Sequence, residues 1–207
     1  MENEQDKKNL PLIGITGGIA SGKSRVSAYL RDQGFYVIDA DKLGHRVLDP
    51  HQRSYKQIVD VFGSRILDDD GAINRKRLGH IVFNDHQKLS QLNQISHPVV
   101  WEMILAEIAE FASHSREGLV FVEAALLIEA GLHSCCRQVW VVAATPEAAI
   151  ARMKKRNQFT EAEAQARLNA QLSNEERQTY ADVWIENNGT LPSLYQQLEM
   201  LLSQMDF

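Results

Sequence analysis

The sequence holds little that would form covalent cross-links or span a membrane. Its 207 residues include only two cysteines, the adjacent Cys135 and Cys136. Adjacent cysteines rarely form a disulfide, and no CxxC spacing is present, so we expect two reduced thiols in a cytoplasmic protein. No apolar run approaches the roughly 20 residues that a membrane-spanning helix needs. The sequence therefore predicts neither a disulfide framework nor a membrane partner.

An excess of positive charge is also missing. The formal net charge is −5, whereas nucleic-acid binders are more often basic. The histidines show no H-x-x-x-H spacing, so we expect no metal cage built from protein ligands alone. Hydrophobic residues at 44% and charged residues at 24% are typical of an ordinary globular protein. We expect one α/β domain with small additions, no nucleic-acid partner, and a monomer or weak homo-oligomer.

One motif is present in full. Residues 17–24 read GGIASGKS, which matches G-x-x-x-x-G-K-[ST]. An apolar run at 10–16 precedes it and a helix-compatible run at 25–31 follows. Glycines let backbone N–H groups approach a phosphate closely, and a helix N-terminus attracts anions. The alternative is a glycine turn that only happens to precede a helix.

The motif predicts a nucleoside triphosphate site with Mg²⁺, and by itself it is compatible with ATP or GTP. Lys23 is expected to contact the β- and γ-phosphates, and the Ser24 hydroxyl to bind Mg²⁺. The residues expected to contact the nucleotide here are Gly17, Gly18, Ile19, Ala20, Ser21, Gly22, Lys23, Ser24 and Arg25.

Apolar runs alternate with helical patterns along the chain. Short strands are predicted at 10–16, 35–38, 118–123, 138–142 and 182–185. Helices between strands favour a parallel sheet of the α/β class. The mostly helical stretch at 42–113 is too long for a simple crossover, so we expect an inserted helical subdomain.

Local signals predict the remaining helices. Pro146 fits the first turn of a helix to about residue 156, and Thr160 with Glu163 forms a capping-box pattern. A closing helix is expected at 191–205. His97-Pro98 fits a helix start with proline in its first turn, and His97 as a substrate contact is the alternative.

Carboxylates follow two predicted strands. Asp39 and Asp41 come directly after the second strand and are candidates to accept a proton or help to hold Mg²⁺, while capping of the next helix is the alternative. Glu123 and Glu129 follow the third strand. Glu123 is a candidate acidic partner of Mg²⁺, and a structural capping role is the alternative.

Basic residues form two clusters. Residues 75–77 read RKR in the helical stretch. Arg152 and Arg156 lie four residues apart on one predicted helix face, near Lys155. Such arginines are candidates to close over phosphates and stabilise charge during transfer. A solvated helix face is the alternative.

The combination of motifs resembles the dephospho-coenzyme A kinases, over about residues 11–202. The resemblance rests on the glycine loop, VIDAD at 37–41, FG at 62–63 before DG at 70–71, NR at 74–75, HP at 97–98, LLIEAG at 126–131, the helix with Arg152 and Arg156, Gln171, and AD at 181–182 leading to Asn187. It implies ATP-dependent phosphorylation of the ribose 3′-hydroxyl of dephospho-coenzyme A, the last step of coenzyme A synthesis.

The resemblance also implies a three-layer P-loop kinase fold with a five-stranded parallel sheet. Its expected parts are a nucleotide-binding core at 10–42, 114–147 and 176–207, a helical coenzyme-binding insertion at 43–113, and a small lid at 148–175. The implied catalytic residues are Asp39, Lys23 and Arg156, with Arg152 at the nucleotide. The residues implied to bind the acceptor substrate are Asp39, Asp41, Arg46, Arg77, His97 and Glu129.

Four positions depart from the family's usual pattern. Many members have threonine where Arg25 stands, and many have arginine at the position of His45. A usual proline is Ala125, and a glutamine on the lid helix is replaced around Ala149. None of these removes the loop, the Asp-x-Asp pair or the lid arginines. The alternatives are another P-loop small-molecule or nucleoside kinase, or a nucleotide-dependent switch, although no Asn-Lys-x-Asp segment for reading guanine occurs.

Overall fold

A computed structural model describes residues 12–114 and 118–205, which form two compact units. The first unit combines residues 12–38 with the described residues after Glu110, and the second is Asp39–Glu110. The predicted insertion, 43–113, has slightly different bounds. Residues 148–175 lie within the first unit, so the separate lid stays a prediction.

A five-stranded sheet forms the centre of the first unit, in the order β2-β3-β1-β4-β5. The strands are β1 (Leu12–Thr16), β2 (Tyr36–Asp39), β3 (Val120–Glu123), β4 (Gln138–Ala143) and β5 (Val183–Glu186). β1 pairs in parallel with β3 and β4, and β4 pairs in parallel with β5. The predicted α/β class and all five predicted strands are confirmed. Because β1 is central, it is buried along its whole length, which explains its continuous apolar sequence.

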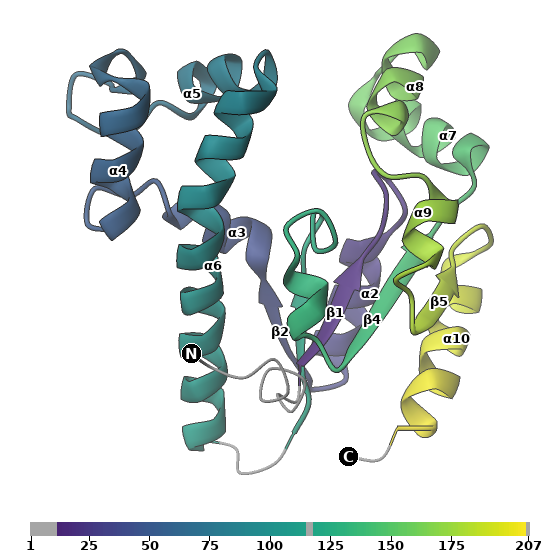
Figure 1. Cartoon of the computed structure of the whole chain (residues 1–207). Coiled ribbons are helices and arrows are strands. Elements are labelled where there is room, and N and C mark those ends of the chain that lie inside the picture. Colours follow the sequence, from purple (N-terminus) through teal and green to yellow (C-terminus); the bar gives the residue numbers. More distant parts are fainter. Residues whose placement is uncertain (1–11, 115–117, 206–207) are drawn as a thin grey trace. The chain divides into compact units, whose positions relative to one another are not determined.

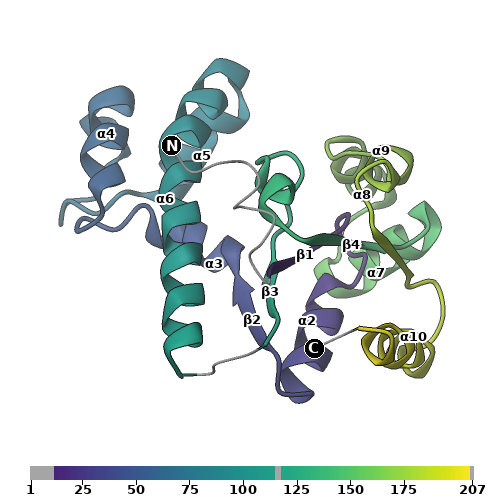
Figure 2. The ribbon, with the colours of Figure 1, turned by 60° about the horizontal axis from the view of Figure 1, so that its bottom comes forward.

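Helices cover both faces of this sheet. They are α2 (Lys23–Asp32), α7 (Pro146–Asn157), α8 (Glu161–Asn169), α9 (Asn174–Gln178) and α10 (Leu191–Ser203). In Figure 2, α10 lies on one side of β4, whereas α8 and α9 lie on the other. Pro146 stands in the first turn of α7, and the capping box of Thr160 and Glu163 is present at α8. The local signals therefore placed these helix starts correctly.

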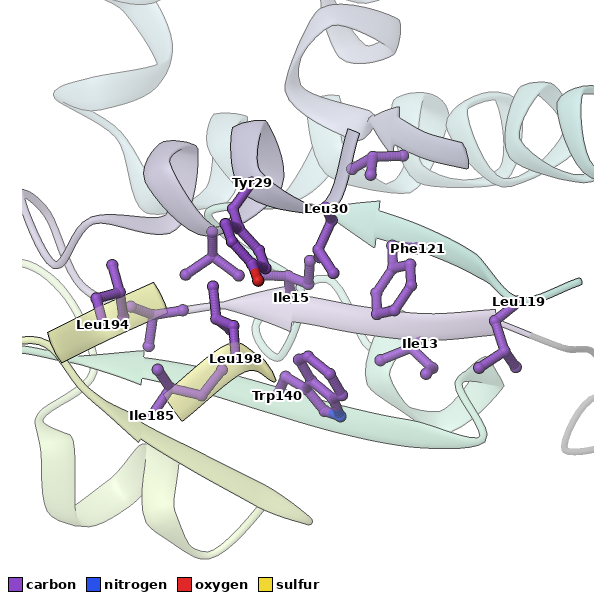
Figure 3. Packing of buried hydrophobic residues seen from close by; sticks show 13 residues of the cluster. Ile13, Ile15, Tyr29, Leu30, Leu119, Phe121, Trp140, Ile185, Leu194 and Leu198 are labelled. Atoms are coloured by element: carbon purple, nitrogen blue, oxygen red, sulfur yellow. The ribbon is translucent and has the colours of Figure 1, made fainter. Parts of the chain in front are cut away.

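The main hydrophobic core lies between the sheet and the helices α2 and α10. Leu30 and Tyr29 of α2 and Leu198 of α10 point towards Ile15 and Trp140 of the strands (Figure 3). Phe121 of β3 meets Trp140 edge to face, with ring centroids 5.4 Å apart. This packing fixes α2, and therefore the loop before it, on the central strand.

The second unit is helical, as predicted. It contains α3 (Ala40–Arg46), α4 (Arg53–Phe62), α5 (Arg75–Phe83) and most of α6 (His86–His114). α4 lies beside the long helix α6 (Figure 1), and Arg53 of α4 forms an ion pair with Glu102 of α6. The predicted turn at 68–71 is confirmed by a hydrogen bond from the Gly71 N–H to the Asp68 carbonyl, 2.9 Å.

The prediction that His97-Pro98 begins a helix is wrong. Pro98 lies inside α6, which begins at His86. A proline in this position removes one backbone N–H and disfavours the helix. The helix nevertheless continues because Val99, Val100, Ile104 and Ile108 on the following turns are buried. Tertiary burial therefore outweighs the local preference of proline.

No helix in the described ranges is both long and apolar enough to cross a membrane. Both thiols, Cys135 and Cys136, are free and buried, and burial raises the pKa of Cys136 to about 12. The two thiols are therefore reduced, as expected, and both are buried.

Truncation of Leu30 should destabilise the first unit strongly. Leu30 is fully buried, so Leu30→Ala removes buried methylene groups and leaves a cavity. We expect the free energy of unfolding to fall by about 3 kcal/mol, measured by urea denaturation. Met200→Ala, at a position 59% exposed on α10, is the control and should change stability by less than about 0.5 kcal/mol. Equal losses in both variants would contradict this description of the core.

Candidate functional site

The loop between β1 and α2 contains three residues with positive φ angles, a backbone conformation that favours glycine. Gly17 and Gly22 have φ angles of 153° and 106°, and Ala20 has a φ of 58°. A Cβ on Gly17 would lie 2.1 Å from the carbonyl oxygen of Val142, and a Cβ on Gly22 would lie 2.1 Å from Nδ2 of Asn187. The motif glycines are therefore required by their neighbours as well as by their torsion angles.

The end of this loop is built to receive an anion. Gly22 precedes α2, and no described side chain caps the first turn of that helix. The first N–H groups of a helix lack partners within it and carry a partial positive charge. Lys23 Nζ donates to the carbonyl oxygens of Gly17 (2.7 Å) and Gly18 (3.4 Å). The lysine ammonium is therefore held over the same loop.

The loop after β5 holds the glycine loop from one side. Asn187 is 8% exposed, and its Nδ2 donates to the carbonyl of Ser21 at 2.7 Å. Arg152 of α7 donates through Nη1 to the carbonyls of Ala20 and Ser21 and through Nη2 to the carbonyl of Asn187. Arg152 thus contacts the loop backbone directly, so the alternative of a merely solvated residue is wrong.

The segment that joins α8 to α9 holds the loop from another side. Gln171 Oε1 accepts a hydrogen bond from the Ile19 N–H at 2.8 Å. Arg177 of α9 is 2% exposed and packs against Gly18, where an added Cβ would lie 3.4 Å from Nη1. Two side chains that are distant in sequence therefore help to set the shape of the loop.

A pocket of about 780 Å³ adjoins the loop. Several candidates from the sequence line it together, namely Lys23, Ser24, Arg25, Glu123, Arg152 and Arg156. Arg156 is exposed and donates through Nε to Asn157 Oδ1 at 3.0 Å. Glu123 ends β3, the immediate neighbour of β1, which explains why it reaches the pocket. The pocket thus combines one carboxylate with several cations.

Other candidates lie in the second unit. Asp39 Oδ1 accepts from the Lys42 N–H at 3.0 Å and so caps α3, and its Oδ2 lies 3.1 Å from Lys42 Nζ. Asp41 is in the first turn of the same helix. The structure therefore contains the capping contact that the sequence offered as the alternative for Asp39. A cap and a chemical role are compatible, because each oxygen of a carboxylate can accept more than one hydrogen bond.

The remaining acceptor candidates are spread over separate elements. Arg46 lies in the last turn of α3, and its Nη1 is 3.9 Å from Oε1 of Glu107 on α6. Arg77 of α5 donates to the carbonyl of Leu67. His97 is half-buried within α6, and this burial lowers its pKa from the ordinary value. Glu129, in the first unit, is exposed, and its charge raises the pKa of Arg177.

Sequence reasoning did not single out Arg177 as a site residue. In the sequence, Arg177 is a single arginine in the polar segment NEERQ, a pattern typical of a solvent-exposed helix. Gln171 and Asn187 entered only through the family resemblance. Only the packing of α9 against β4 and the loop brings Arg177 to Gly18.

The four positions that depart from the family's usual pattern lie in different environments. Arg25 is exposed at the pocket, which Ala125 also lines. Ala149 is buried, 2% exposed, on α7. The His45 carbonyl accepts from Arg75 Nη2 at 3.4 Å. Arg25 and Ala125 are thus the two substitutions of this set placed at the pocket.

A parallel sheet with a glycine loop between its central strand and the following helix defines a P-loop nucleotide-binding fold. The comparisons make the class specific. The sequence model of the family described as dephospho-CoA kinase matches residues 11–193. The chain belongs to the dephospho-CoA kinase family, which carries out the final step of coenzyme A biosynthesis.

Individual relatives agree with this assignment. A dephospho-CoA kinase from Lactobacillus johnsonii is 40% identical over 193 residues, which cover 93% of this chain and 97% of the relative. A solved dephospho-CoA kinase from Campylobacter jejuni has a TM-score of 0.70 and 28% identity, and the match covers 94% of this chain and 96% of that one. A solved protein from Thermus thermophilus has a TM-score of 0.80 and 32% identity, over 95% and 98% of the two chains.

Replacement of Gly22 should damage nucleotide binding. Gly22→Ala puts a Cβ against Asn187 Nδ2 at a φ that alanine rarely adopts, so the hydrogen bond from Asn187 to Ser21 must shift. We expect ATP affinity, measured by calorimetry, to fall at least about tenfold. Gly44→Ala is the matched control, because nothing lies within 4 Å of its added Cβ. Wild-type ATP affinity in Gly22→Ala would disprove the proposed constraint.

The burial of His97 should make stability fall in acid. Its pKa is lowered in the folded protein, so the unfolded chain binds the proton more tightly. The stability from neutral His97 is complete above the unfolded pKa of about 6.5 and is lost as pH falls through the folded pKa. We expect urea titrations from neutral to acid pH to show a smaller stability loss for His97→Gln than for wild type. His86→Gln, exposed on the same helix, is the control, and parallel curves for His97→Gln and wild type would refute the expectation.

Proposed function

We propose that this chain transfers the γ-phosphoryl group of ATP to the ribose 3′-hydroxyl of dephospho-coenzyme A, giving coenzyme A and ADP. The observation that carries the proposal is the glycine loop, fixed at the end of β1 and lined by cations, in a chain of the dephospho-CoA kinase family. The new bond joins the ribose oxygen to the γ-phosphorus. The bond from that phosphorus to the bridging oxygen of ADP breaks.

The residues present fit a triphosphate with Mg²⁺. A Cβ on Gly17 or Gly22 would collide with Val142 or Asn187 and displace the loop backbone, and the start of α2 has no side-chain cap among the described residues. The Ser24 hydroxyl is the proposed protein ligand of Mg²⁺, with Glu123 as a candidate acidic partner. Mg²⁺ usually takes few protein ligands and completes its shell with phosphates and water. When bound, the ion would neutralise part of the phosphate charge.

Each of the main side chains has a proposed role. Asp39 orients the acceptor hydroxyl and accepts its proton as the new bond forms. Lys23 neutralises charge that develops on the transferred group, and Arg156, on the lid at 148–175, closes over the phosphates to exclude water. Water exclusion matters because an open site would hydrolyse ATP.

Further contacts complete the proposed site. Residues 17–25 and Arg152 are proposed to contact the nucleotide. The side chains proposed to bind the acceptor substrate are Asp39, Asp41, Arg46, Arg77, His97 and Glu129. The net charge of −5 and the two free thiols support a cytoplasmic enzyme that binds no nucleic acid, and we propose a monomer or weak homo-oligomer.

The activity itself is tested by ATP turnover measured with and without dephospho-coenzyme A. We expect turnover to depend on the acceptor, and mass spectrometry to show a product one phosphoryl group heavier. A panel of nucleosides, nucleotides and sugars provides the comparison. A strong preference for a nucleoside would reject the coenzyme acceptor, and turnover without transfer to any acceptor would favour a nucleotide-dependent switch.

Asp39→Asn separates the chemical role of this residue from its cap. Asparagine is also a good N-cap, so α3 should be kept while the basic carboxylate is lost. We expect ATP affinity within about twofold of wild type and a transfer rate lower by about 10²- to 10⁴-fold. Asp32→Asn, at the end of α2, is the control for loss of one negative charge. A near-normal transfer rate in Asp39→Asn would show that the assigned role is wrong.

A further inference from the structure

Arg177 carries a buried positive charge with few partners. Its side chain is 2% exposed, and Nη1 donates to the carbonyl of Leu172. Its Nε and Nη2 are buried and have no hydrogen-bond partner in the part of the chain that the structure describes. Burial lowers the pKa of Arg177, but an arginine stays protonated in proteins. A buried charge without partners is costly, so such a residue needs a reason.

The nearby carboxylates compensate this charge only weakly. Glu129 and Glu176 both raise the pKa of Arg177, so their charges reach it. Glu129 is exposed, and water screens its interaction. The Glu176 carboxylate is also exposed and already accepts from the Ser173 N–H at 2.7 Å. The charge of Arg177 therefore remains largely unbalanced.

The unbalanced charge lies directly against the phosphate loop at Gly18. Arg177 Nη1 would be 3.4 Å from a Cβ on Gly18, and no side chain separates the two. Arg177, Gly18, Ile19 and Gln171 line one pocket of about 410 Å³, beside the larger pocket that also holds Gly18 and Lys23. The field of a charge is strong where water is excluded. A phosphate bound on the loop would thus interact with the charge of this guanidinium.

We propose that Arg177 is a positioning residue whose unbalanced charge, applied through the backbone at Gly18, strengthens binding of the nucleotide's phosphates. This inference rests on the proposed function, because it assumes that a triphosphate binds on the loop. In this proposal Arg177 acts through the loop backbone and not by touching the nucleotide or the acceptor. Its desolvation destabilises the free protein, and the arrival of phosphate charge offsets that cost.

The charge can be separated from the packing by two substitutions. Arg177→Met keeps a long apolar stem and removes the charge, whereas Arg177→Lys keeps the charge and removes the planar fork. We expect Arg177→Met to weaken ATP binding about tenfold and Arg177→Lys to stay within about threefold of wild type. The loss should be smaller for ADP and absent for adenosine. Calorimetry without any acceptor measures all three ligands.

The matched control is Arg137→Met, at the other end of β4. Arg137 is exposed just before Gln138, the first residue of that strand, so its charge is screened. We expect its ATP affinity to equal that of wild type. Unchanged ATP binding in Arg177→Met, or equal losses in the Met and Lys variants, would overturn the electrostatic role.

Two further measurements keep the test decisive. Circular dichroism reports whether each variant folds. If Arg177→Met does not fold, Glu129→Gln provides a second test. It removes the carboxylate that partly offsets the charge of Arg177, so its effect on ATP binding should have the opposite sign. We expect it to tighten ATP binding about twofold, and unchanged or weaker binding would count against the inference. Wild-type transfer to dephospho-coenzyme A is measured in parallel, so a failure of this inference is distinct from a failure of the proposed function.

Discussion

The backbone of the phosphate loop is closely packed at Gly17 and Gly22, and the rest of the site depends on this constraint. Gly17 lies against the carbonyl of Val142 on β4, and Gly22 lies against Asn187 after β5. The loop therefore takes its shape from the ends of two neighbouring strands, as well as from its own glycines. A correct sheet order is a precondition for the site, because β4 must lie next to β1 and β5 next to β4.

The hydrogen bonds around the loop divide its backbone into two kinds of group. Its carbonyl oxygens face donors, since Lys23 contacts Gly17 while Arg152 and Asn187 contact Ser21. With the carbonyls engaged by cations and an amide, repulsion between carbonyl oxygens and an incoming phosphate is reduced. The N–H groups at the start of α2 are left for the anion. The same cations thus organise the free loop and give the site an excess of positive charge.

The parts of this arrangement that are local in sequence could be predicted. The loop motif, the five strands and the capping box of Thr160 each depend on residues close together in the chain. Pro98 shows the limit of local rules, because burial of the turns after it keeps α6 continuous. Arg177 shows a second limit. Nothing near it in sequence distinguishes it from a surface arginine, and its role depends on a contact with a residue 159 positions earlier.

An acidic protein that binds acidic substrates must separate its charges in space. The formal net charge is −5, yet the pocket beside the loop combines Lys23, Arg25 and Arg152 with one carboxylate, Glu123. A single carboxylate among several cations suits a divalent ion that must share the site with a triphosphate. More carboxylates would hold the ion without the nucleotide, and would also repel the phosphates. If Mg²⁺ binds here as proposed, this local excess of positive charge would make ion binding depend on nucleotide binding.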